Sequence, residues 1–125
     1  MRKVIGIGET ILDIIFRNGQ PTAAVPGGSV FNGIVSLART GVPVSFISET
    51  GNDQVGNTIL QFMQDSGMST EYVNVFPDGK SPVSLAYLNE HGDAEYIFYK
   101  DYPKTGRRRH RSFRFIFCPE PGVAR

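Results

Sequence analysis

Short β-branched segments alternate with two segments of helical period over residues 3–67. Residues 3–8 (KVIGIG) and 44–48 (VSFIS) are apolar runs typical of buried strands. Apolar residues recur at spacings of three and four after Ser29 and again after Asp53, which predicts a helix after each. The order strand, helix, strand, helix predicts parallel strands in an α/β fold.

The ends of both predicted helices are marked by residues that favour helix termini. Gly41, with Pro43 just beyond it, ends the first helix, and Gly67 ends the second. Asp53 is predicted to cap the N-terminus of the second helix, at the close of a polar loop over residues 49–53. Both helices are therefore expected to be short and sharply bounded.

Further segments predict strands outside this alternation. Residues 11–18 (ILDIIFRN) predict a strand that runs into the turn sequence NGQP. After Gly67 the chain is rich in Val, Tyr and Phe, which favours short strands that need not belong to the main sheet. These segments are residues 71–76, 82–89 and 94–100, with EHGD joining the last two as a hairpin.

Composition indicates one globular domain. A chain of 125 residues with 40% hydrophobic residues is large enough to bury a single core. The lone cysteine, Cys118, excludes an internal disulfide framework, and neither His91 nor His110 has a neighbour at metal-ligand spacing. The first apolar run stops at Glu9, too early for a signal peptide or a membrane span. We expect a cytoplasmic protein with no metal site and no membrane partner.

The charge is divided unevenly along the chain. Residues 1–103 hold 6 Lys and Arg against 11 Asp and Glu, whereas residues 104–125 hold 7 against 1. The second segment has four arginines between Arg107 and Arg111 and no amphipathic period. We interpret residues 104–125 as a basic tail, non-native or disordered, translated from a shifted reading frame. Nucleic-acid binding by this tail is the alternative, and it is disfavoured because almost any arginine-rich segment binds phosphates weakly.

The glycine pair in PGGSVFNGIVSLARTG raises the question of a phosphate site. A dinucleotide fingerprint needs G-x-G-x-x-G, but the run from Gly6 has Ile11 in the third position, and the sequence contains no Walker loop. Gly27 and Gly28 still place bare backbone at a helix N-terminus, where amide groups attract anions or a substrate oxygen. The alternative is a tight turn into the helix, which this stretch by itself favours.

Four motifs follow one another along the chain: GETILD, GGSVFNGIVSLARTG, ETGNDQVG and GDAEYIFYK. Together they resemble the N-terminal part of the ribokinase-like (PfkB-type) carbohydrate kinase family, over residues 3 to about 103. Ile34 departs from the pattern, because the family has a small residue there. The positions that match the family signature are Gly27, Gly28, Asn32, Gly41 and Gly51. The resemblance implies the N-terminal portion of a ribokinase-like αβα sandwich with a small β lid, the C-terminal half being missing.

The resemblance assigns sugar-binding roles to Asp13, Gly27, Gly28 and Asn32, whose counterparts in the family bind sugar hydroxyls. These residue types suit a sugar, because a carboxylate accepts hydrogen bonds from two vicinal hydroxyls, a carboxamide donates and accepts, and glycine lets a ring lie close. The alternatives are that Asp13 bonds its own backbone and that Asn32 faces solvent.

The last predicted strands resemble the family's lid, a small sheet that covers the sugar and in many members forms a dimer contact. Tyr87, Phe98 and Lys100 fall where many members place sugar-contacting lid residues. Packing within the lid is the alternative for the aromatic residues. A homodimer through the lid strands is a further prediction.

The resemblance also implies an activity: ATP-dependent phosphorylation of a sugar hydroxyl, with fructose or a related sugar as substrate and with ATP and Mg²⁺. The family's catalytic Asp lies in a Gly-Ala-Gly-Asp stretch, and this sequence contains none. We therefore expect the substrate-binding half of a sugar kinase, with no catalytic residue, no ATP site and no activity alone. The alternative is a non-catalytic module that binds sugars or dimerises.

Overall fold

The computed structural model describes residues 3–103 and 115–118. The predicted basic tail thus lies outside the described residues, except for one short strand at 115–118. No helix in the described ranges is long and apolar enough to cross a membrane. In chain order the elements are β1 (Lys3–Ile7), β2 (Ile11–Arg17), β3 (Gln20–Gly27), α1 (Ser29–Arg39), β4 (Val44–Gly51), α2 (Gln54–Asp65), β5 (Val73–Phe76), β6 (Lys80–Leu88), β7 (Ala94–Asp101) and β8 (Phe115–Cys118).

The main sheet has the strand order β5-β4-β1-β8. β1 and β4 are parallel, as predicted, with Val4 opposite Val44, and β5 is parallel to β4, with Ser48 opposite Val73. β8 pairs antiparallel with the other edge of β1. The parallel arrangement follows from the helices that separate these strands in the chain, because parallel neighbours need a crossover connection.

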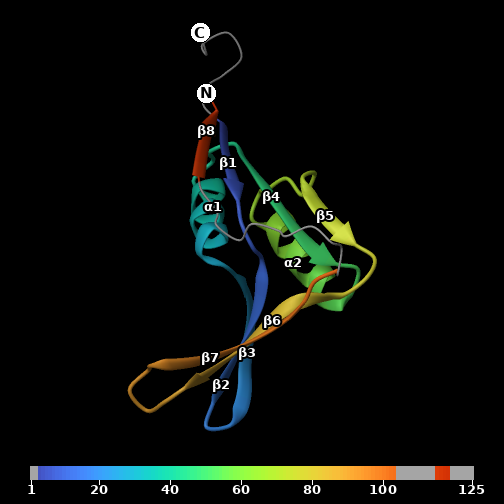
Figure 1. Cartoon of the computed structure of the whole chain (residues 1–125). Helices are drawn as coiled ribbons and strands as arrows, with labels where there is room; N and C mark the ends of the chain where they lie inside the picture. Colours follow the sequence, from blue (N-terminus) through green and yellow to red (C-terminus); the bar gives the residue numbers. More distant parts are fainter. Residues whose placement is uncertain (1–2, 104–114, 119–125) are drawn as a thin grey trace.

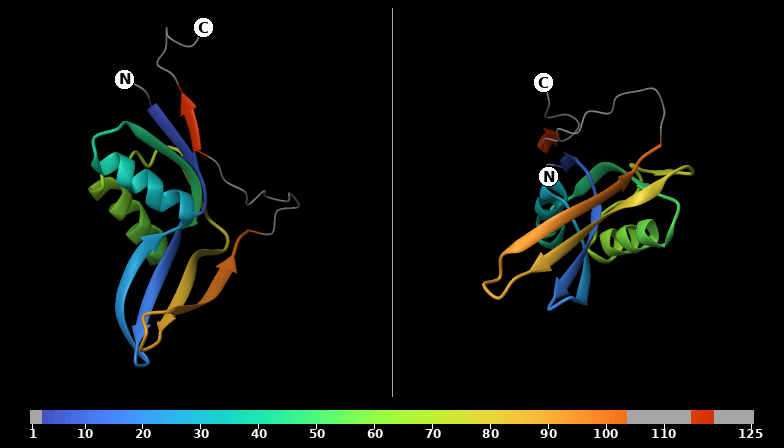
Figure 2. Two further views of the ribbon diagram at one scale, coloured as in Figure 1. Left: turned by 90° about the vertical axis from the view of Figure 1, so that its left-hand side faces the viewer. Right: turned by 60° about the horizontal axis from the view of Figure 1, so that its bottom comes forward.

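Both helices cover the same face of the main sheet, and the core lies between them and the sheet (Figure 2). Phe31 of α1 packs edge-on against Phe46 of β4, with ring centroids 5.6 Å apart, and both side chains are fully buried. β1 carries Gly6 where α1 crosses it, and a Cβ there would lie 2.5 Å from Cγ1 of Ile34. This glycine therefore serves the close packing of helix on strand.

The second sheet, with the order β3-β2-β6-β7, extends away from the helices (Figure 1) and is the lid sheet. β2 is parallel to β6, with Asp13 opposite Ser84, and antiparallel to β3. β6 and β7 form the predicted hairpin, with Ser84 opposite Phe98. β6 and β7 thus lie outside the main sheet, whereas β5, which the sequence does not distinguish from them, belongs to it.

The strand β3 is absent from the sequence prediction, which has only a turn in this region. Pro21 and Pro26 argue against a strand, because proline donates no hydrogen bond to a ladder. β3 lies at the edge of the lid sheet, where prolines are tolerated. The turn itself is confirmed: Asn18 and Gly19 have φ of 50° and 74° and join β2 to β3 as a two-residue hairpin.

The helix ends lie where the sequence places them. Gly41, just beyond α1, adopts a φ of 89°. Asp53 caps α2, since its Oδ1 accepts a hydrogen bond from the Gly56 amide at 2.8 Å. The predicted polar loop over residues 49–53 is wrong in part, because β4 continues to Gly51 alongside β5.

Asp53 also joins the lid sheet to the main sheet. Its Oδ2 accepts a hydrogen bond from the Ser81 amide at 2.8 Å, and its Oδ1 accepts one from the Ser81 hydroxyl at 2.6 Å. Burial by itself would raise the pKa of Asp53, but the hydrogen bonds from Ser81 and from the Gly56 amide, with the charge of Lys80, hold that pKa below its usual value. One carboxylate therefore caps α2 and fixes the start of β6.

Candidate functional site

A polar cluster forms where the lid sheet meets the start of α1. Ser84, which is fully buried, donates a hydrogen bond from its hydroxyl to Oδ1 of Asp13 on the neighbouring strand. A Cβ on Gly27, at the end of β3, would lie 2.6 Å from Oδ2 of Asp13 and 4.0 Å from Oδ1 of Asn32. The bare backbone of Gly27 therefore makes room for the carboxylate. Three of the residues assigned from the sequence, Asp13, Gly27 and Asn32, come together here.

The orientation of Asp13 is set by a different strand. The Ser84 hydroxyl that holds it is 71 residues away in the chain. Oδ2 of Asp13 points toward the glycine pair, and the side chain is partly exposed. Asn32 is exposed on the first turn of α1, with its Oδ1 on the same side of Gly27. These two polar groups can therefore reach one ligand.

Gly28 has a structural reason to be glycine. It is the N-cap residue of α1 with a φ of 133°, which side chains rarely adopt. A Cβ there would lie 2.5 Å from the main-chain oxygen of Glu9. Gly28 thus lets the segment after β1 pass directly against the N-terminus of α1, and it places Glu9 beside the glycine pair.

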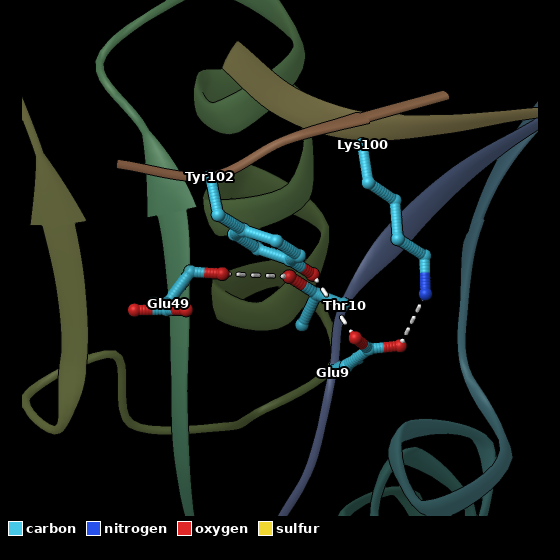
Figure 3. Close-up of polar contacts among 5 residues, drawn as sticks. All are labelled: Glu9, Thr10, Glu49, Lys100 and Tyr102. Carbon is cyan, nitrogen blue, oxygen red and sulfur yellow. Dashed lines mark hydrogen bonds and ion pairs between the residues drawn. The ribbon is translucent and has the colours of Figure 1, made fainter. Parts of the chain in front are cut away.

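Glu9 forms a second polar group with Lys100 and Tyr102 (Figure 3). Its Oε2 pairs with Nζ of Lys100 at 2.9 Å, and its Oε1 accepts a hydrogen bond from the Tyr102 hydroxyl at 3.2 Å. The next residue, Thr10, is buried and donates from Oγ1 to the main-chain oxygen of Glu49 at 3.5 Å. The end of β7 is therefore tied to the connection between β1 and β2.

Phe98 lies on the same face of the lid sheet as Asp13 and Ser84. It is opposite Ser84 in the β6–β7 register, and 58% of the residue is exposed. Its ring stacks on that of Tyr96, with centroids 6.0 Å apart, and Nζ of Lys100 lies 5.7 Å from its centroid. Two of the three predicted lid residues, Phe98 and Lys100, therefore lie on the face of the lid sheet that carries the cluster.

Tyr87 lies on the opposite face of the lid sheet. It is three residues from Ser84 on the regularly paired strand β6, so its side chain points away from Asp13. Its ring stacks on Phe16 with centroids 4.7 Å apart. The structure therefore does not bring Tyr87 to the cluster, because alternation along a strand separates residues at odd spacing.

The sequence does not identify Ser84 or Glu9 as members of the cluster. Ser84 is one serine within a predicted strand, and only the pairing of β2 with β6 places it on Asp13. Glu9 belongs to the motif GETILD that carries the family resemblance, so its place in that motif was a usable signal.

The arrangement offers both polar and apolar contacts to one ligand. It combines a carboxylate, a carboxamide, a glycine surface and an exposed aromatic ring, which together suit a small molecule with several hydroxyl groups. Within the described ranges, three or more His, Cys, Asp or Glu side chains nowhere gather as a metal-binding group.

A separate groove lies on the other face of the lid sheet, against α2. It is lined by Ala24, Pro26, Asn57, Thr58, Gln61, Phe62 and Asp65.

Comparisons with known proteins identify relatives among sugar kinases. The model of the pfkB family carbohydrate kinases matches residues 1–110. The ribokinase of Bacillus subtilis is 31% identical over 93 residues, which cover 74% of this chain and 29% of that protein. The 5-dehydro-2-deoxygluconokinase of Geobacillus thermodenitrificans is 31% identical over 106 residues, which cover 78% of this chain and 31% of that protein.

A solved structure agrees with the fold. A fructokinase with bound ATP from Xylella fastidiosa matches with a TM-score of 0.68 at 22% identity, covering 78% of this chain and 33% of its own. This likeness confirms the ribokinase-like fold that the motifs imply. The chain spans about a third of the length of the proteins it matches. Because the family match extends over residues 1–110 and includes the whole cluster around Asp13, this chain belongs to the pfkB family of carbohydrate kinases.

Proposed function

We propose that this chain is the sugar-binding part of an ATP-dependent carbohydrate kinase. The observation that carries the proposal is the convergence of Asp13, Gly27 and Asn32, with the Asp13 carboxylate oriented by Ser84. A carboxylate fixed through one oxygen presents its other oxygen in a defined direction, which suits the hydrogen bonds of a sugar hydroxyl pair. Membership of the pfkB family supports a carbohydrate as the ligand.

In this proposal each residue of the cluster has its own part. Oδ2 of Asp13 accepts from sugar hydroxyls, and the Asn32 carboxamide donates or accepts beside it. Gly27 and Gly28 form the surface against which the ring lies, since neither has a Cβ. Phe98 covers the apolar face of the ring, and Lys100 closes the edge of the site.

We infer that the sugar is fructose or a related sugar. The motif GETILD and the Tyr- and Phe-rich lid resemble fructokinase-like members of the family. The names of the relatives, ribokinase and 5-dehydro-2-deoxygluconokinase, and of the structural neighbour, fructokinase, include both neutral sugars and a sugar acid. The lid would exclude water and orient the accepting hydroxyl when it covers the ligand.

Phosphoryl transfer would require a nucleotide site and a catalytic Asp, which the third of the relatives' length matched by this chain does not supply. ATP with Mg²⁺ provides the transferred phosphoryl group in such kinases, and the Xylella fastidiosa fructokinase structure contains bound ATP. The Gly-Ala-Gly-Asp stretch of the family is absent from this sequence, and the described residues form no acidic group that would hold the metal. The residues present therefore fit a sugar and do not fit the nucleotide, and we expect the isolated chain to bind sugar without phosphorylating it.

Titration of the 125-residue chain with a sugar panel tests the proposal. Calorimetry with fructose, ribose, glucose and 5-dehydro-2-deoxygluconate should show one site that prefers fructose, with millimolar to micromolar affinity as is usual for kinase substrates. Xylitol, an open-chain polyol, is the control ligand and should bind more weakly because it has no ring to lie on the glycine surface. Equal heats for all the ligands, or none, would exclude a sugar site.

The face of the lid sheet opposite Asp13 and Ser84 carries side chains that suit a second role, as a dimer contact. Phe16 and Tyr87 stack on this face. Tyr87, Ile97 and Tyr99 are exposed large hydrophobic residues that leave this same face. An exposed apolar patch of this kind marks an interaction surface. We propose that two copies of the chain pair through this face of the lid.

Analytical ultracentrifugation tests the dimer. The chain should sediment as a dimer at micromolar concentration, and Ile97→Asp should convert it to a monomer because a charge would be buried in the contact. The matched variant is Val75→Asp on β5, which introduces the same change at an exposed apolar residue of the main sheet and should leave the dimer intact. A monomeric parent chain would refute the contact.

A further inference from the structure

Glu9 and Lys100 form an ion pair, in which the charge of each side chain is balanced by the other. Nζ of Lys100 lies 2.9 Å from Oε2 of Glu9, and the Tyr102 hydroxyl donates to the other oxygen at 3.2 Å. Only 24% of the Lys100 side chain and 27% of the Glu9 side chain are exposed. A partly exposed pair is less screened than a pair that lies wholly in solvent, so each charge offsets part of the other.

This pair lies at the border of the proposed sugar site. Lys100 is two residues beyond Phe98 on β7, so both side chains leave the same face of the lid sheet as Ser84 and Asp13. On the other side, the main-chain oxygen of Glu9 lies against Gly28. Figure 3 shows the two side chains meeting between β7 and the segment after β1, and we place this pair at the edge of the ligand that would lie on the glycine surface.

Lys100 is the described cation that leaves the lid sheet beside Phe98, on the face that carries Asp13. The remaining described Lys and Arg side chains belong to other places: Lys3 beside Tyr72, Arg39 beside Phe62, Arg17 opposite Gln20 at the hairpin turn, and Lys80 at the start of β6. At the proposed site, the two carboxylates of Asp13 and Glu9 thus outnumber the one ammonium group of Lys100, so the charge beside a ligand is negative.

We propose that Glu9 makes this site select neutral sugars over sugar acids. The inference rests on the proposed sugar site and concerns which class of sugar it accepts. A ligand carboxylate needs a cation, and Lys100 is already paired with Glu9, so an acid would have to displace Glu9 or lie beside two carboxylates. A neutral sugar meets no such repulsion, because its hydroxyls accept from Lys100 or donate to either carboxylate.

The test compares Glu9→Gln with the parent chain of 125 residues. Calorimetry with fructose and with 5-dehydro-2-deoxygluconate gives the ratio of the two affinities for each protein. Glu9→Gln should raise the affinity for the acid about fivefold relative to fructose, the change expected when a partly exposed pair is removed and the lysine becomes available. The gain should fall at high salt, because it is electrostatic.

Two further variants separate this effect from a general loss of structure. Glu95→Gln makes the same substitution on the opposite face of β7, where Glu95 pairs with Tyr87, and should leave the ratio at the parent value. Lys100→Met combined with Glu9→Gln should abolish the gain, since the ammonium that receives the acid is gone. Thermal unfolding of each variant reports whether the fold is retained.

The outcomes distinguish this inference from the function on which it rests. If the parent binds fructose and Glu9→Gln leaves the ratio unchanged, the sugar site stands and the role of Glu9 is refuted. If fructose fails to bind but the acid binds Glu9→Gln more tightly than the parent, the preference for fructose falls and the role of Glu9 stands. If neither ligand binds either protein, both are refuted.

Discussion

Replacing Asp13 by Asn is expected to weaken fructose binding roughly a hundredfold while the chain unfolds at nearly the same temperature. The fold should tolerate the change because Asn keeps an Oδ1 that accepts from the Ser84 hydroxyl. Binding should not tolerate it, because the group at Oδ2 becomes an amide that donates instead of accepting. Hydrogen bonds to a charged acceptor are worth about 1.5–3 kcal/mol each, so losing one strong bond of this kind gives an effect of this size.

Two comparisons make the Asp13 result interpretable. Asp78→Asn, in an exposed turn, changes the charge equally and should leave fructose binding intact. Gly27→Ala keeps the carboxylate but adds a Cβ 2.6 Å from its Oδ2, and it should weaken binding by displacing that oxygen. Unchanged affinity in Asp13→Asn would remove this carboxylate from the site, and lost affinity accompanied by unfolding would show a structural role alone.

Replacing Asp53 by Ala is expected to lower the free energy of unfolding by about 2 kcal/mol, and the melting temperature by about 10 °C. The variant loses the cap of α2 and both hydrogen bonds to Ser81, which leaves the buried Ser81 hydroxyl without its acceptor at 2.6 Å. Asp53→Asn retains an acceptor for the Gly56 amide, so about half of the loss is expected. Denaturant unfolding measures both, with Asp78→Ala as the control.

The contribution of Asp53 should also depend on pH, with a definite sign. The folded-state pKa of Asp53 is lowered, so the folded chain binds its proton less readily than the unfolded chain does. The stabilisation is therefore complete above the unfolded value of about 4 and is lost as the pH falls through the lowered folded-state pKa. The difference in stability between the parent and Asp53→Ala should accordingly shrink below about pH 4. A difference that stays constant from about pH 7 to about pH 3 would contradict this assignment.

Helix ends and turns were predictable because they depend on neighbouring residues. Gly41 takes a positive φ, Asp53 caps its own helix, and Asn18 with Gly19 forms a hairpin turn, all through interactions within a few residues. β3 was not predictable in the same way. Its two prolines are acceptable only because the strand lies at a sheet edge, and the position of a strand within its sheet is not a local property.

The residues of the candidate site likewise differ in whether the sequence could place them. Asp13, Gly27, Gly28 and Asn32 were assigned from motif order, and the structure brings the side chains of Asp13 and Asn32 to one glycine. The assignment of Tyr87 to the same site used only its place in a strand rich in aromatic residues. Alternation along β6 puts it on the other face, which required the register with β2 to be known.

By itself, the sequence determined the helices with their ends, the parallel direction of the strands that the helices separate and the family to which the chain belongs. Each of these follows from local periodicity, from residues that favour helix ends or from the order of the motifs. Only the tertiary structure decided that Ser84 orients Asp13, that Asp53 joins the two sheets and that Glu9 neutralises Lys100. These contacts join residues 28 to 91 positions apart, so they depend on strand pairing and sheet order, which no local pattern encodes.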